Sequence, residues 1–155
     1  NAKANSKDAC KILGVEEIPF TTQPYGNLAY SQDAMRELEN IIKTLDIDTC
    51  IYHFSDDYNT DHVAANTICN TAFRHCKSTM MFQSNPYITE KLFAPNFFID
   101  VSKFIDLKKA ALSCYEKDHD RQGKLFDTAI ERNKIWGYAC HCEYAEGFKV
   151  VKFSI

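Results

Sequence analysis

The segment from position 53 to position 62 concentrates side chains that could bind a metal ion or transfer a proton. It is HFSDDYNTDH, which holds two histidines, three aspartates, a serine, a tyrosine and an asparagine. His62 could offer a neutral imidazole nitrogen to a metal, and Asp61 could orient a neighbouring side chain by hydrogen bonding. Alternatively, Asp61 only favours the start of a helix and His62 is solvated. A single Asp–His pair leaves both interpretations open.

The elements that flank this segment place it where ligands usually bind. Residues 49–54 (TCIYHF) form a continuous apolar run, which predicts a buried parallel strand. Residues 61–73 carry Ala65, Ile68, Cys69 and Ala72 at helical spacing, which predicts a helix with one apolar face. In sheets built from parallel strands, ligands bind beyond the carboxyl ends of the strands. The polar loop between these two elements is therefore the first candidate for a site.

The rest of the chain alternates strand and helix patterns. Further strands are predicted at 18–20, 78–82, 96–100 and 144–153, and further helices at 3–13, 31–45, 102–114 and 125–136. Ser31 and Ser102 are predicted N-caps, Gly14 and Gly137 are predicted to end helices, and 116–123 is a predicted surface loop. This order predicts an α/β protein, a Rossmann-like three-layer α/β/α sandwich with a mainly parallel sheet, in one domain over 1–155.

Composition excludes several classes of partner. The chain has 155 residues, a net charge of -3 and a pI near 5.9, which argues against a nucleic-acid-binding surface. No apolar stretch is long enough for a transmembrane segment. The seven cysteines include no CxxC pair, and Cys140-His141-Cys142 lacks further ligands, so reduced thiols in a cytoplasmic protein are expected. Asn1-Ala2 is consistent with the remnant of an expression tag.

Several short motifs resemble one enzyme family when they are taken in order. Asn59-Thr60-Asp61-His62 is similar to an H-x-D-H motif, with asparagine in place of the first histidine. Residues 9–15, 97–102, 108–112 and 144–151 resemble other segments of the same family in the same order. The chain thus resembles the LmbE-like / PIG-L family of metal-dependent sugar N-deacetylases over nearly its whole length.

The resemblance implies a role for each residue of the loop. His62 would be a ligand of a divalent metal, usually zinc, and Asn59 would stand where the family has a histidine that stabilises the tetrahedral intermediate. Asp61 would orient the site, and Ser55, Asp56 and Tyr58 would bind substrate. The activity implied is hydrolytic removal of an N-acetyl group from an amino sugar, such as N-acetylglucosamine, or from a sugar conjugate.

One motif of the family is missing from this sequence. The family's first strand leads into a P-H-P-D-D motif that supplies two more metal ligands and the general base, and none of the five histidines here is followed by Pro-Asp-Asp. We therefore expect the C-terminal portion of the family's domain, with a sheet incomplete at its N-terminal strand. Such a chain alone would be inactive and could lack zinc. Its unpaired strand edge favours a homo-oligomer.

The sequence leaves two other functional classes as alternatives. A truncated or degenerate α/β module could bind a sugar or a protein partner without catalysis. A nucleotide-binding Rossmann domain is disfavoured, because the sequence has no glycine-rich fingerprint after a predicted strand.

Overall fold

The computed structural model describes residues 2–19, 26–84, 87–115 and 124–154. Its internal contacts divide the chain into two compact units, which are described separately. The first unit comprises Asn1–Pro19 and Phe98–Gly147, and the second comprises Phe20–Phe97 and Phe148–Ile155.

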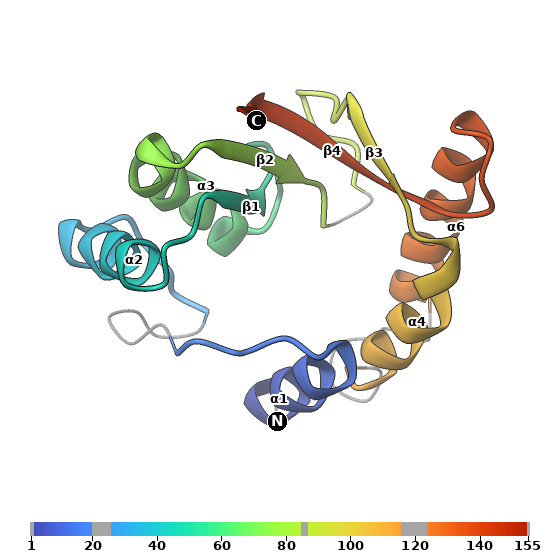
Figure 1. Ribbon diagram of the computed structural model, residues 1–155, viewed down its shortest axis with the longest axis horizontal. Coiled ribbons are helices and arrows are strands. Elements are labelled where there is room, and N and C mark those ends of the chain that lie inside the picture. Colours follow the sequence, from blue (N-terminus) through green and yellow to red (C-terminus); the bar gives the residue numbers. More distant parts are fainter. Residues whose placement is uncertain (1, 20–25, 85–86, 116–123, 155) are drawn as a thin grey trace. The chain divides into compact units, whose positions relative to one another are not determined.

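The second unit is built around a parallel pair of strands with helices beside it (Figure 1). Its elements are α2 (Gln32–Thr44), β1 (Thr49–His53), α3 (Thr60–Ala72), a 3-10 turn η1 (Phe73–His75) and β2 (Ser78–Phe82). β1 and β2 run parallel, in a register that pairs Thr49 with Ser78 and His53 with Phe82. The predicted strands at 49–54 and 78–82 and the predicted helix at 61–73 are therefore confirmed.

The sheet is mixed. β4 (Ala145–Lys152) pairs antiparallel with β2, and β3 (Phe97–Asp100) lies next to β4, so that the strand order is β1-β2-β4-β3. β3 and β4 each have residues in both units. The predicted α/β class is confirmed, but among the described strands the parallel arrangement is limited to β1 and β2. Antiparallel strands at one side of a parallel sheet are common in α/β proteins.

The first unit is mostly helical. It contains α1 (Ala2–Leu13), a 3-10 turn η2 (Ser102–Phe104), α4 (Ile105–Ser113) and α6 (Lys124–Ala139), and α1 packs against α4. Gly14 ends α1 as predicted: its φ is +67°, and the amides of Gly14 and Val15 bond to the carbonyls of Lys11 and Cys10. This pair of bonds is a Schellman motif, which favours glycine at the left-handed position. None of the described helices has the length and hydropathy needed to cross a membrane.

Three local predictions differ from the structure. Gly137 does not end a helix, because α6 continues to Ala139; there a Cβ would lie 2.6 Å from the carbonyl oxygen of Glu143, so glycine permits a close backbone approach. Ser102 does not cap α4 but begins η2, and its hydroxyl bonds to Asp100 and to the amide of Tyr144. Ile18 is not in a strand. Phe20 and the predicted loop at 116–123 lie outside the described residues.

Candidate functional site

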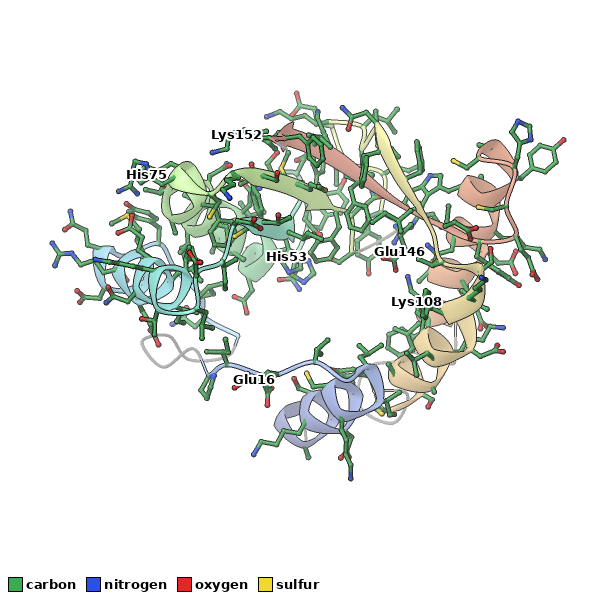
Figure 2. The ribbon with its side chains drawn as sticks, viewed as in Figure 1. Glu16, His53, His75, Lys108, Glu146 and Lys152 are labelled. Atoms are coloured by element: carbon green, nitrogen blue, oxygen red, sulfur yellow. The ribbon has the colours of Figure 1, made fainter. Side chains whose placement is uncertain are left out.

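The carboxyl ends of β1 and β2 bring four polar residues together. His53 is the last residue of β1, and Figure 2 shows it beside α3. Ser84 follows the end of β2 by two residues, and His62 lies in the first turn of α3. Asp57 belongs to the loop between β1 and α3. The cluster therefore lies where the sequence placed the candidate site, at the ends of two parallel strands.

Local hydrogen bonds fix the start of α3. Asn59 is the N-cap, and its side-chain Oδ1 accepts from the amide of Asp61 at 2.9 Å. The amide of Asn59 in turn donates to Oδ1 of Asp57 at 2.8 Å. Short polar side chains favour these bonds, since they satisfy amides that have no partner within the helix. The loop sequence thus fixes the direction in which His62 leaves the helix.

The ring of His62 is held through one nitrogen. Nδ1 lies 2.9 Å from Oδ2 of Asp57 and 3.0 Å from Oγ of Ser84. A carboxylate oxygen accepts, so Nδ1 is the donor in the bond to Asp57. The side chain of Asp57 is 8% exposed, which strengthens the interaction by excluding water. A carboxylate that holds one ring nitrogen is the arrangement that commonly orients a histidine ligand toward a metal.

His53 supports the ring of His62 by stacking. The two ring centroids are 4.2 Å apart with planes 13° apart, and the ring of Phe82 lies 4.7 Å from that of His53. Burial, and secondarily the neighbouring His62, lower the pKa of His53 to about 4. Its Nδ1 is buried and has no hydrogen-bond partner within the described part of the chain. His53 is therefore neutral near pH 7 and acts on His62 through packing.

A chain of side-chain hydrogen bonds joins the end of β1 to α3. The hydroxyl of Tyr52 donates to Asn70 at 2.7 Å, Asn70 donates to Asn66 at 3.2 Å, and Asn66 donates to the carbonyl of His53 at 2.7 Å. Asn66 is 4% exposed. A buried amide without partners would be costly, so these bonds select one orientation of the helix against the strand.

The other predicted site residues have different partners. Oδ1 of Asp61 accepts from the amide of Leu28 at 3.0 Å, so the carboxylate on the ring of His62 is that of Asp57. Oδ2 of Asp56 accepts from the amide of Lys91 at 2.5 Å, and bonds from Lys91 and Thr89 lower the pKa of Asp56.

Ser55 and Tyr58 lie on the loop between β1 and α3. Ser55 is partly exposed. Tyr58 is 72% exposed, and its ring centroid lies 6.0 Å from that of Tyr87. The loop thus presents Tyr58 to solvent next to an aromatic residue from the segment that Asp56 holds.

Sequence reasoning missed Asp57, Ser84 and Asn66 as parts of the site. Asp57 could have been noticed from its position within the polar loop, and Asn66 from its place one turn after His62, on a helix with an apolar face. Ser84 carried no signal, because its approach to His62 depends on the parallel pairing of β1 with β2.

The described residues do not complete a zinc site. A catalytic zinc ion usually has three protein ligands. Within 2–19, 26–84, 87–115 and 124–154, no group of three or more His, Cys, Asp or Glu side chains is arranged to hold a metal. His62 has the hydrogen bonding of a ligand, but it is a single candidate.

Solved structures establish the class of fold. The conserved protein TT1542 from Thermus thermophilus matches 99% of this chain and 74% of its own length, with a TM-score of 0.84 and 21% identity. The hydratase GalB from Pseudomonas putida matches 99% of this chain and 72% of its own length, with a TM-score of 0.74 and 20% identity. N,N'-diacetylchitobiose deacetylase from Pyrococcus horikoshii matches 96% of this chain and 62% of its own length, with a TM-score of 0.73 and 17% identity. The chain shares the α/β fold of these three proteins.

A family model also matches part of the sequence. The family model described as GlcNAc-PI de-N-acetylase, PIG-L, matches residues 2–73, a segment that includes β1, the polar loop and α3. The match confirms the resemblance to the LmbE-like / PIG-L family.

Proposed function

We propose that this chain supplies part of the active site of a metal-dependent hydrolase that removes an N-acetyl group from an amino sugar or sugar conjugate. The observation that carries the proposal is His62, held through Nδ1 by the nearly buried Asp57 at the ends of two parallel strands, within the segment that matches the PIG-L model. His62 would be a zinc ligand through Nε2. The described residues do not group three potential metal ligands, so the roles proposed below are limited to hydrogen bonding and substrate contact by the chain's own side chains.

Asn59 is proposed as a hydrogen-bond donor to the developing oxyanion. Its Oδ1 is committed to the helix cap, which identifies the other end of the amide as the NH₂ group. This NH₂ group makes no hydrogen bond within the described part of the chain, so it can donate to a reacting carbonyl. An amide carries no charge and should contribute less than a protonated histidine. Asp61 is proposed to position this turn through its bond to Leu28.

Substrate contacts are proposed for the exposed face of the same loop. Tyr58 and Tyr87 present two aromatic rings that could pack against the apolar face of a sugar. Asp56 would act indirectly, because its carboxylate holds the segment that carries Tyr87 through the amide of Lys91. Ser55 would donate to or accept from a sugar hydroxyl.

The test is acetate release from N-acetylglucosamine and its conjugates by the protein as purified from its native cells. We expect release that a chelator abolishes and that metal restores. His62→Ala should remove it, whereas His75→Ala, which changes a histidine outside the cluster, should not. Equal acetate release by His62→Ala and the unchanged protein would refute the proposal.

A second proposed function is a non-catalytic module that binds a sugar or a protein partner. The observation that favours it is the single metal-ligand candidate among the described residues. GalB, a hydratase, has a similar fold, so the fold does not by itself select deacetylation. Sugar binding that His62→Ala leaves unchanged, without acetate release, would favour this second function.

A cytoplasmic location and assembly as a homo-oligomer remain proposals. All seven cysteines are free thiols, which suits a reducing compartment. Size-exclusion chromatography with light scattering would measure the assembly state.

A further inference from the structure

Two buried thiols face each other in the second unit, away from the cluster around His62. Cys50 lies on β1 and is 6% exposed, and Cys76 follows η1 and is 4% exposed. Their sulfur atoms are 3.4 Å apart, although 26 positions separate them in the sequence. A disulfide bond is about 2.05 Å long, so the two sulfurs need to approach by roughly 1.4 Å to bond.

A pocket gives one of these thiols a route to solvent. The pocket has a volume of about 420 Å³ and lies between α2 and the end of α3. Cys76 forms part of its wall, which carries charged side chains of both signs, Glu39, Asp46, Lys43 and Arg74, together with His75. A small polar oxidant that enters the pocket therefore comes next to Cys76, although little of that residue's surface is exposed. Cys50 does not line this pocket.

Cys50 is a poor candidate for the first step of an oxidation. Burial, and then its contact with Cys76, raise the pKa of Cys50 to about 12. A thiol attacks peroxide as its thiolate, so Cys50 is poorly suited to react first. It is well placed to act second, because its sulfur already contacts that of Cys76.

We propose that Cys50 and Cys76 form a redox modification site, in which hydrogen peroxide entering the pocket converts the two thiols to a disulfide. The sulfur of Cys76 first attacks peroxide: an S–O bond forms, the O–O bond breaks, and the leaving hydroxide takes the thiol proton as water. The sulfur of Cys50 then attacks that of Cys76: the S–S bond forms, the S–O bond breaks, and a second water leaves with the proton of Cys50. Two thiols lose two electrons in total, and one peroxide becomes two waters.

The bridge would join β1 to the segment after α3. It restricts the unfolded chain across a loop of 26 positions, so the oxidised protein should be more stable. For a chain of this size we expect the Tm to rise by about 5–10 °C. This effect does not depend on the proposed deacetylase activity.

The experiment treats the folded full chain with hydrogen peroxide, blocks remaining thiols by alkylation in denaturant, and maps the peptides by mass spectrometry. We expect a cross-linked peptide pair that contains Cys50 and Cys76, and the higher Tm. In Cys50→Ala, dimedone should label Cys76, because the second thiol is missing. Cys69→Ala is the matched control, since it removes a neighbouring thiol and should leave the bridge intact.

Three results would overturn the proposal. One is a peptide map in which Cys76 stays reduced while the exposed Cys140 is oxidised. Another is a bridge from Cys50 to Cys69 in place of Cys76. The third is a Cys50–Cys76 bridge that forms only after the chain has been unfolded in urea.

Discussion

Replacing Asp57 with asparagine should move the proton on the ring of His62. Both oxygens of Asp57 act as acceptors, one from the amide of Asn59 at 2.8 Å and one from Nδ1 of His62 at 2.9 Å. Asparagine has one oxygen and one NH₂ group, so it cannot serve both donors. If the oxygen keeps the amide of Asn59, the NH₂ group faces Nδ1, and the imidazole proton must move to Nε2.

The size of the effect follows from the bond that is lost. A hydrogen bond to a charged group contributes about 1.5–3 kcal/mol, so the ratio of the Nδ1–H form to the Nε2–H form should fall by about 10- to 150-fold. Two-bond ¹H–¹⁵N correlation spectra of the imidazole distinguish the two forms near pH 7.5. Since Nε2 would then carry the proton, the variant should also lose the lone pair proposed to face a metal.

The control makes the same chemical change one position earlier. Asp56 bonds to the amide of Lys91 and not to the ring of His62, so Asp56→Asn should leave the imidazole spectrum unchanged. An unchanged ratio of the two forms in Asp57→Asn, or an equal change in both variants, would refute the assignment of Asp57 as the residue that orients His62.

Three further predictions follow from the structure. Gly137→Ala should destabilise the protein by about 1–3 kcal/mol in urea unfolding, because the new Cβ would lie 2.6 Å from a backbone oxygen; Ile135→Ala, on the exposed face of α6, should cost less. The pKa of His53 is about 4 in the folded chain and about 6.5 when unfolded, so the unfolded state binds more protons between these values; stability should fall as pH drops from 6.5 to 4, and His53→Phe should flatten that slope. The 155-residue chain expressed by itself, in contrast to the protein purified from its native cells, should show neither tight stoichiometric zinc binding by calorimetry nor acetate release, and either result would contradict the expectation that these residues alone do not complete the site.

The main elements of the fold could be predicted because their signals are local. The apolar run at 49–54 and the helical spacing at 61–73 correspond to β1 and α3. The direction of β4 could not be predicted, since a strand's apolar pattern does not say whether its neighbour runs parallel or antiparallel. The end of the last helix was predicted wrongly at Gly137 for a related reason. Glycine is common just after helices, but here it is required by the close approach of the Glu143 backbone, which is a tertiary contact that the local sequence does not reveal.

The predicted site stays a prediction, but the structure gives the contacts of the residues that it names. The sequence placed His62 at a strand-to-helix junction, and the structure has its ring stacked on the last residue of β1. The sequence favoured Asp61 as the orienting carboxylate because it is adjacent to His62. The structure has Asp57 in contact, since the cap at Asn59 turns the loop back on the helix. Which of several carboxylates meets a ring depends on the path of the loop, and composition does not determine that path.

The bonds from Tyr52 through Asn70 and Asn66 to the carbonyl of His53 make these positions interdependent. Removing the tyrosine hydroxyl leaves the Asn70 carbonyl oxygen without its donor, and an apolar residue at position 70 would in turn leave the buried Asn66 without the donor to its Oδ1. Related proteins should therefore vary at positions 52, 66 and 70 together rather than singly. Because these bonds fix the rotation of α3 against β1, substitutions on the solvent-facing side of α3 should leave the orientation of His62 unchanged.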